Sequence, residues 1–169
     1  MLTKRQLLLE IAHEIKNTNY CSSRLKTKIK NAVASGVNLN AKIYKGRTLM
    51  HYAVKANAKG IVKVLNDAGV NPSICDDDFY TPLHFAVVNN KYQALLDLIK
   101  IGVDLNATAE FEQTPLHMAV ANGNLKMVKI LVEKGADKNV VDEKNLTPLD
   151  YAKDENDILI VKYLEDLGR

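Results

Sequence analysis

Histidine is the residue type in this chain whose spacing most invites a chemical interpretation. Three of the four histidines, His51, His84 and His117, follow one another at steps of 33 residues. Imidazole nitrogens bind zinc and transfer protons near neutral pH. Tetrahedral ligands must converge on one ion, however, and side chains one repeat apart along a chain do not. We therefore expect these histidines to be structural, and we expect no metal site.

Acidic and thiol side chains give no stronger indication of catalysis. The run Asp76–Asp78 lacks the glycine and the terminal glutamate of a calcium loop, so we expect a solvated loop tip. Cys75 has no histidine or basic residue beside it in the sequence that would activate the thiol. No sequence typical of a hydrolase nucleophile, a phosphate-binding loop or a zinc protease occurs. The sequence predicts no catalytic residue, no cofactor and no enzymatic activity.

Composition limits the classes of partner. The 169 residues are 47% hydrophobic and 25% charged, which is typical of one folded domain with a buried core. A net charge of +3 is too small to indicate a nucleic acid or a membrane surface. No apolar run approaches the roughly 18 residues of a membrane span, and two cysteines make no disulfide framework, which favours a reducing compartment. We expect a monomeric cytoplasmic protein with no membrane insertion.

Glycine and threonine show which elements position these residues. Five of the eight glycines lie 33 residues apart, at Gly36, Gly69, Gly102, Gly135 and Gly168. Four windows with the same step, TLMH, TPLH, TPLH and TPLD, begin at Thr48, Thr81, Thr114 and Thr147. Threonine caps a helix, proline suits its first position, and the asparagine or glycine nine residues after each threonine tolerates the left-handed conformation that ends it. Each window therefore predicts a helix of about eight residues.

A second helix is predicted in each repeat. Apolar residues recur at helical spacing in segments 60–67, 92–99, 125–134 and 158–166, each followed by a periodic glycine. Polar, turn-rich segments come next, and we call these connecting loops fingers. Residues 1–38 lack the threonine window but contain two amphipathic segments, 2–16 and 23–33, which predict a further helix pair.

The windows and the glycine series together resemble the ankyrin-repeat family. The resemblance implies an all-α solenoid of stacked helix-turn-helix repeats with β-hairpin-like fingers, in which the histidine hydrogen-bonds near the helix start and to the neighbouring finger. It divides one continuous domain into a capping helix pair, residues 1–38, and repeats at about 39–71, 72–104, 105–137 and 138–169. The family glycine two residues before the threonine survives only as Gly46, so we expect the other finger turns to be reshaped.

The resemblance also implies a non-enzymatic module that binds another protein through its concave groove and finger tips, as a scaffold or an effector. Positions at the fingers and on the first helices vary between repeats while the structural positions recur. The predicted partner-binding residues are Tyr44, Lys45, Arg47, Lys55, Asp77, Asp78, Tyr80, Asn89, Glu110, Phe111, Gln113, Asn122, Lys144 and Leu146. A periodic stripe is interpreted as packing between repeats, with a partly open groove position as the alternative; it consists of Tyr52, Phe85, Met118 and Tyr151.

Two functions of other classes stay open. A nucleic-acid- or nucleotide-binding ankyrin domain would use the basic N-terminal third, where Lys26, Lys28 and Lys30 lie, but few aromatic residues are interleaved there for base stacking. The chain could also be the docking arm of a larger enzyme. Lysine outnumbers arginine 19 to 4 and asparagine occurs 16 times, which indicates an AT-rich genome and raises the hypothesis of an effector that acts inside a host cell.

Overall fold

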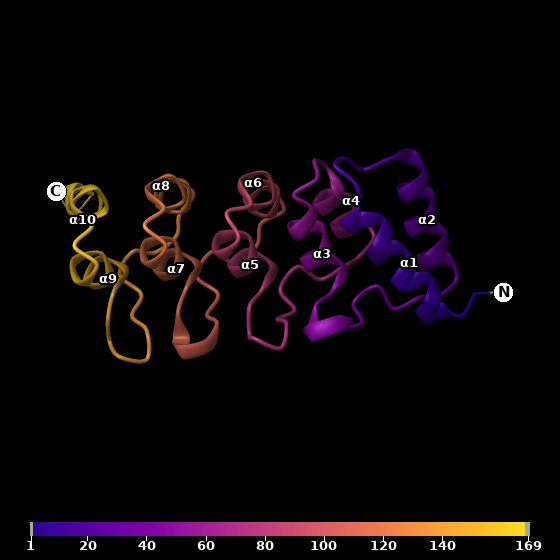
Figure 1. The fold of residues 1–169 in the computed structure, drawn as a ribbon, viewed down its shortest axis with the longest axis horizontal. Helices are drawn as coiled ribbons and strands as arrows, with labels where there is room; N and C mark the ends of the chain where they lie inside the picture. The colour runs from indigo at the N-terminus through magenta and orange to yellow at the C-terminus, as the bar shows by residue number, and fades with distance from the viewer. Residues whose placement is uncertain (1, 168–169) are drawn as a thin grey trace. The chain divides into compact units, whose positions relative to one another are not determined.

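The repeats form pairs of short antiparallel helices joined by loops, as seen in a computed structural model that describes residues 2–167 (Figure 1). The described residues contain ten α-helices, two 3-10 turns and no β-strand. The helices are α1 (Lys4–Lys16), α2 (Ser23–Ala34), α3 (Leu49–Ala56), α4 (Ile61–Asp67), α5 (Pro82–Val88), α6 (Tyr92–Lys100), α7 (Pro115–Ala121), α8 (Leu125–Glu133), α9 (Pro148–Asp154) and α10 (Ile158–Asp166). The all-α fold predicted from the sequence is confirmed.

Local capping rules set the helix boundaries. Each threonine of the four windows is the N-cap of α3, α5, α7 or α9, and proline occupies the first position of the last three. Asn57, Asn90 and Asn156 have φ values of 52°, 55° and 54° just after the first helix of their repeats. The four described periodic glycines also have left-handed φ values, whereas Gly168 lies outside the described residues.

Two compact units make up the chain, Met1–Val103 and Asp104–Arg169. In the N-terminal unit, α3 lies between α1 and α5 and packs against both, while α2 packs on α1, α4 on α3, and α6 on α4 and α5. The core here includes the predicted apolar faces of the first helix pair, with Leu8, Ile11 and Ile15 of α1 and Ile29 of α2 buried.

The C-terminal unit repeats the same packing on a smaller scale. Helix α7 packs against α8 and α9, and α10 packs against α9 and α8. Leu116, Met127, Leu131 and Ile160 are fully buried between them. Leu149 is only half-buried, unlike its counterparts Met50 and Leu83, which are fully or almost fully buried in the N-terminal unit.

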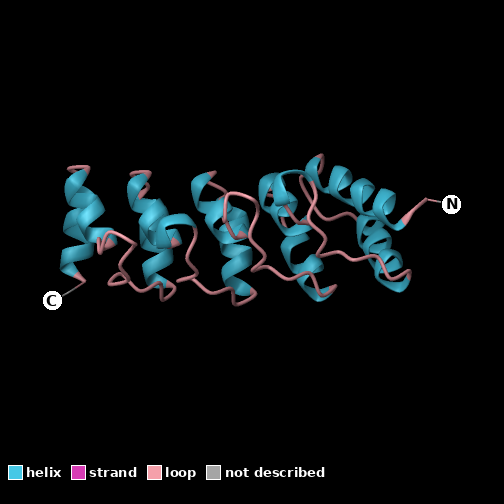
Figure 2. Ribbon diagram, turned by 90° about the horizontal axis from the view of Figure 1, so that it is seen from below, coloured by secondary structure: helices cyan, strands magenta, loops and turns pink. Residues whose placement is uncertain are grey.

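The fingers are loops without strands, so the β-hairpin-like character is limited to the closure of each tip (Figure 2). We number the tips one to four as residues 43–47, 76–80, 109–113 and 142–146. In each tip the backbone N–H of the first residue donates to the carbonyl of the fifth, at 2.8–3.0 Å. The 3-10 turns Tyr44–Gly46 and Glu110–Glu112 lie in fingers one and three.

Candidate functional site

Two of the periodic histidines link a helix start to the next finger. His51 is fully buried; its Nδ1 accepts a hydrogen bond from the Thr48 backbone N–H at 3.2 Å, and its Nε2 lies 2.9 Å from the carbonyl oxygen of Tyr80 in finger two. His117 repeats this arrangement with Thr114 at 3.2 Å and Leu146 at 3.0 Å. These contacts match the structural role that the resemblance implied. Across residues 2–167, no cluster of three or more His, Cys, Asp or Glu side chains could hold a metal ion.

Burial keeps these imidazoles neutral. It lowers the pKa of His51 and of His117 below the ordinary value, although the carbonyl that each ring contacts acts in the opposite direction. A neutral ring accepts at Nδ1 and donates from Nε2–H, which is the combination that the two contacts require. In the fourth repeat Asp150 stands in place of the histidine and keeps one of its two contacts: its Oδ2 accepts a 2.8 Å hydrogen bond from the Thr147 backbone N–H.

The acidic run in finger two is not uniformly solvated, which corrects the prediction for Asp76. Its side chain is buried and accepts hydrogen bonds from the backbone N–H groups of Asp78 and Tyr80, both at 3.1 Å. The Arg47 Nε lies 3.5 Å from the other carboxylate oxygen. Asp77 and Asp78 are exposed, as expected. Asp76 therefore shapes the finger, and its two neighbours form the surface.

Asp142 has the same role in finger four. Its Oδ1 accepts from the backbone N–H groups of Lys144 and Leu146, and its Oδ2 accepts from the Tyr151 hydroxyl at 2.6 Å. Burial alone would raise the pKa of Asp142, but these hydrogen bonds together hold it below its ordinary value. Two of the four fingers are thus folded around a buried carboxylate.

The position of the family glycine keeps a left-handed backbone in all four fingers, so the loss of glycine does not change the conformation at this position. Phe79, Glu112 and Asn145 have φ values of 61°, 58° and 59°, close to the 66° of Gly46. Fingers one and three differ from the others at the preceding residue, because Lys45 and Phe111 are left-handed as well. A non-glycine residue in this conformation costs about 1–2 kcal/mol.

Neighbouring fingers are joined within each unit. The backbone N–H of Asp77 donates to the carbonyl of Lys45 at 3.2 Å, and that of Glu143 donates to the carbonyl of Phe111 at 3.1 Å. The accepting residue is in both cases the additional left-handed residue of its finger. Gly46 has a specific reason to remain glycine, since a Cβ there would lie 2.6 Å from the Asp77 backbone nitrogen.

Arg47 and Gln113, predicted to bind a partner, also hold the scaffold together. The Arg47 guanidinium lies 4.8 Å from the centre of the Phe85 ring, in addition to its contact with Asp76. The Gln113 side-chain amide donates to the Tyr151 hydroxyl at 2.7 Å. The packing interpretation of the aromatic stripe fits Phe85 and Met118, which are buried, whereas Tyr52 and Tyr151 are partly exposed.

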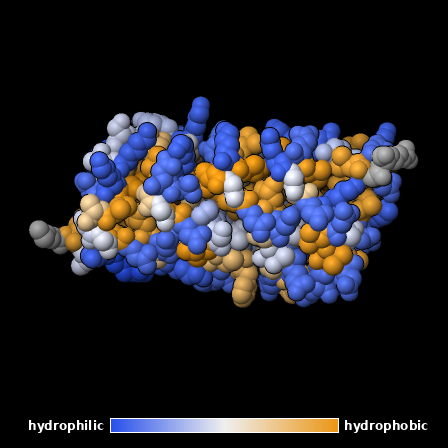
Figure 3. All heavy atoms as spheres, turned by 180° about the vertical axis from the view of Figure 1, so that it is seen from behind, coloured by the Kyte–Doolittle hydropathy of each residue, from blue (hydrophilic) through white to orange (hydrophobic). Residues whose placement is uncertain are grey.

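Exposed aromatic rings mark three finger tips. Tyr44 is 71% exposed and Phe111 is 53% exposed, whereas the predicted Tyr80 is half-buried and its ring stacks on His84 at 6.3 Å. The exposed ring of finger two belongs to Phe79, which is 61% exposed. The sequence interpretation considered this residue only as a replacement for the family glycine. Figure 3 shows hydrophobic side chains that reach the surface among hydrophilic ones on one face.

The other predicted partner-binding residues divide by exposure. Leu146, the last residue of tip four, is half-buried. The exposed ones are Lys45, Lys55, Asp77, Asp78, Asn89, Glu110, Asn122 and Lys144. Within the N-terminal unit, Tyr44, Arg47 and Lys55 come together around a cleft of about 180 Å³, which Lys16, His51 and Tyr52 also line.

Comparison with protein families agrees with this geometry. Residues 9–109 match a model of ankyrin repeats in three copies, and residues 98–152 match one of ankyrin repeats in many copies. The chain belongs to the ankyrin-repeat family. No curated protein matches its sequence. Ankyrin repeats are generally modules for protein–protein interaction and are typically non-enzymatic. None of the helices that the structure describes has the length and apolar character that crossing a bilayer requires.

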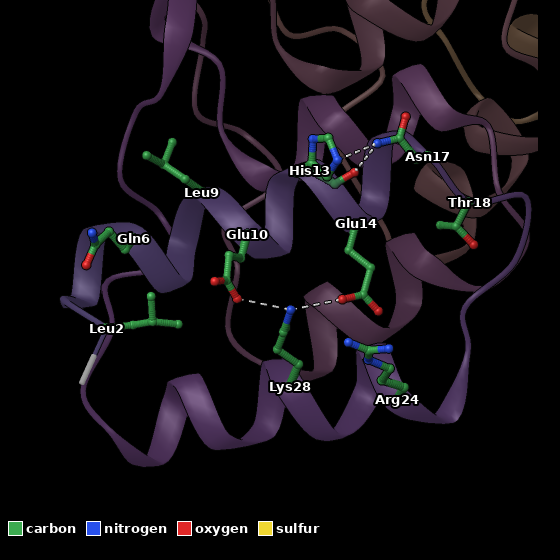
Figure 4. Close-up of a pocket in the computed structure, with 10 residues that line it drawn as sticks. All are labelled: Leu2, Gln6, Leu9, Glu10, His13, Glu14, Asn17, Thr18, Arg24 and Lys28. Carbon is green, nitrogen blue, oxygen red and sulfur yellow. Dashed lines mark hydrogen bonds and ion pairs between the residues drawn. The ribbon is translucent and has the colours of Figure 1, made fainter.

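A larger groove of about 870 Å³ lies on the first helix pair of this ankyrin-repeat chain (Figure 4). Lys28 of α2 reaches between Glu10 and Glu14 of α1, with its Nζ 3.3 Å and 3.1 Å from their carboxylates. Burial acts to lower the pKa of Lys28, but the hydrogen bonds from its ammonium group to the two carboxylates raise it overall. The ammonium group in the middle of the groove is therefore fully paired, with a carboxylate on either side of it.

Proposed function

We propose that this chain binds a partner protein through its finger tips and first helices, as a scaffold or an effector; the alternative is that it serves as the docking arm of a larger enzyme. The observation that supports the proposal best is the exposed aromatic side chain on fingers one, two and three. Aromatic residues dominate the binding energy of protein interfaces because they bury a large area at a small entropic cost. Here they lie on turns that backbone hydrogen bonds hold in place.

A nucleic-acid partner fits these fingers less well. Asp77, Asp78 and Glu110 are exposed on the same tips as Phe79 and Phe111. A phosphate backbone at either tip would meet these carboxylates, whereas a protein partner can place cations or amides against them. The monomeric state and the cytoplasmic location remain proposals, which light scattering after size exclusion and cell fractionation would test.

The test is affinity capture followed by binding measurements on tip variants. Once mass spectrometry has identified a captured protein, surface plasmon resonance compares Tyr44→Ala, Phe79→Ala and Phe111→Ala with the native chain. We expect at least one tip variant to weaken binding by about 2 kcal/mol. The matched control is Tyr20→Ala, because Tyr20 is 66% exposed but lies between α1 and α2.

Charge reversal at finger two distinguishes residues that speed association from residues that hold the complex together. Changing Asp77 and Asp78 to lysine should mainly alter the association rate at low salt, since exposed rim charges act on encounter. If all three aromatic variants bind as the native chain does, the partner uses another face and the proposal fails.

A further inference from the structure

The 180 Å³ cleft of the N-terminal unit, which we call the basic cleft, is built by three elements. The C-terminal end of α1 contributes Lys16, finger one contributes Tyr44 and Arg47, and α3 contributes His51, Tyr52 and Lys55. Its volume lies below the roughly 300–1,000 Å³ typical of sites for small molecules and cofactors. The cleft has room for side chains of a docked segment rather than for a whole nucleotide.

The polar groups at the floor of the basic cleft are already engaged. Arg47 pairs with Asp76 and lies over the Phe85 ring, so its charge is largely compensated. His51 is neutral, with both ring nitrogens in hydrogen bonds to Thr48 and Tyr80. These two residues define the shape of the cleft, and the remaining cations determine what it attracts.

The other two cations that line the basic cleft are lysines, and neither has its charge balanced by an ion pair. Lys16 and Lys55 are exposed, and neither ammonium group has a carboxylate within salt-bridge distance among residues 2–167. Lys42 and Lys45, also exposed and without an ion pair in that range, add positive charge on finger one. This differs from the groove on the first helix pair, where two glutamates neutralise Lys28.

The walls of the basic cleft are aromatic. Tyr44 is largely exposed and Tyr52 is partly exposed, and each presents an apolar ring with a hydroxyl at its edge. Such rings contact apolar side chains and the backbone of an extended segment. A cation on each of two elements, together with aromatic rings that line the same cleft, complements a segment that combines carboxylates with apolar groups.

We infer that the basic cleft binds an acidic peptide segment of the partner, in which carboxylates that pair with Lys16 and Lys55 flank an apolar side chain held by the tyrosines. The inference rests on the proposed protein-binding function and specifies the chemistry of the partner. A polynucleotide is disfavoured at this site because Asp77 of finger two is hydrogen-bonded directly to finger one and carries an exposed carboxylate. A peptide can place an uncharged residue opposite this carboxylate, whereas every nucleotide of a polynucleotide carries a negative phosphate.

The experiment selects peptides from a phage-displayed library of random dodecapeptides on the immobilised full chain. We expect the selected peptides to be enriched in Asp and Glu around an apolar residue. One selected peptide, labelled with fluorescein, is then titrated by anisotropy with the native chain and with the double variant Lys16→Glu, Lys55→Glu. We expect this variant to lose at least tenfold in affinity, and a peptide with its glutamates changed to glutamines to lose as much.

The matched control is the double variant Lys26→Glu, Lys30→Glu. It makes the same charge change on exposed positions of α2 in the same unit, and should stay within about threefold of the native affinity because rim charges away from a contact act weakly. Circular dichroism melting of both double variants confirms that each is folded. A loss in the control equal to that in the cleft variant would move the site to α2 and overturn the inference.

The remaining outcomes separate this inference from the proposed function. Selected peptides without acidic enrichment, whose binding depends on Phe79 or Phe111 but not on Lys16 and Lys55, would refute the inference and leave the protein-binding proposal intact. Selection of no peptide at all would refute the inference. Binding of a 20-nucleotide poly(U) RNA with steep salt dependence, lost on changing Lys16 and Lys55, would identify a polyanion site and contradict both.

Discussion

Truncation of His51 tests whether the periodic histidine stabilises the fold. His51→Ala removes the acceptor for the Thr48 N–H and the donor to the Tyr80 carbonyl, in a position with no exposed surface. The buried Thr48 N–H is left without an acceptor, which costs about 1–3 kcal/mol. The Tyr80 carbonyl loses one hydrogen bond, worth about 1 kcal/mol, and keeps the one from the Asp76 N–H. The lost contact of the ring with Phe85 adds a cavity term. We expect the free energy of unfolding to fall by about 3–5 kcal/mol, measured by urea denaturation followed by circular dichroism.

Two further variants make this measurement specific. His51→Asn restores a neutral acceptor for the helix start, in the way that Asp150 accepts from Thr147, and should recover about 1 kcal/mol. His13→Ala, on the exposed face of α1, removes only the 3.1 Å contact with Asn17 and should cost under about 0.5 kcal/mol. If His51→Ala unfolds within about 1 kcal/mol of the native chain, the two hydrogen bonds do not stabilise the fold as argued.

Four other predictions follow from the packing. Burial lowers the pKa of His51 and His117 below 6.5, so the unfolded chain binds more protons than the folded chain as the pH falls through that value. The free energy of unfolding should therefore decrease below about pH 6.5. In the His51→Asn, His117→Asn double variant this decrease should be less steep. Ala86→Leu should cost about 1–3 kcal/mol, because Ala86 is fully buried in α5, and a melting temperature within one degree of native would contradict this. Treatment with EDTA should leave helix content and melting temperature unchanged. Hydrogen exchange should be faster in α9 and α10 than in α5 and α6, and the reverse order would show that the last repeat is not the weakest.

The helices were predictable because their signals are local. A threonine N-cap, a proline at the first position and an asparagine or glycine after the last turn act within a few residues, so the sequence alone located both ends of α5, α7 and α9. The first helix pair was found from its apolar spacing without any threonine window. The limits of the repeats within residues 1–38 and 39–169 remain a prediction.

The fingers were less predictable, because their structure depends on where backbone groups point. A run of three aspartates is by composition a solvated tip, yet Asp76 is buried because two backbone N–H groups converge on it. A signal was available in the sequence: Asp76 and Asp142 both stand five residues before a threonine of the repeat. Phe79 was overlooked because its position was compared with the family glycine rather than considered for its own side chain.

Finger three shows why strained turns and binding can belong together. Phe111 is left-handed, its carbonyl accepts the hydrogen bond from the Glu143 N–H, and its ring is 53% exposed. One hydrogen bond between fingers stabilises the fold by about 1 kcal/mol. This roughly offsets the backbone strain of one left-handed residue, and the strain of the second, Glu112, is not offset. An exposed turn with no further role would relax by acquiring glycine. A ring held in a fixed position binds with a smaller loss of conformational entropy, and this gain is available only when a partner covers the tip.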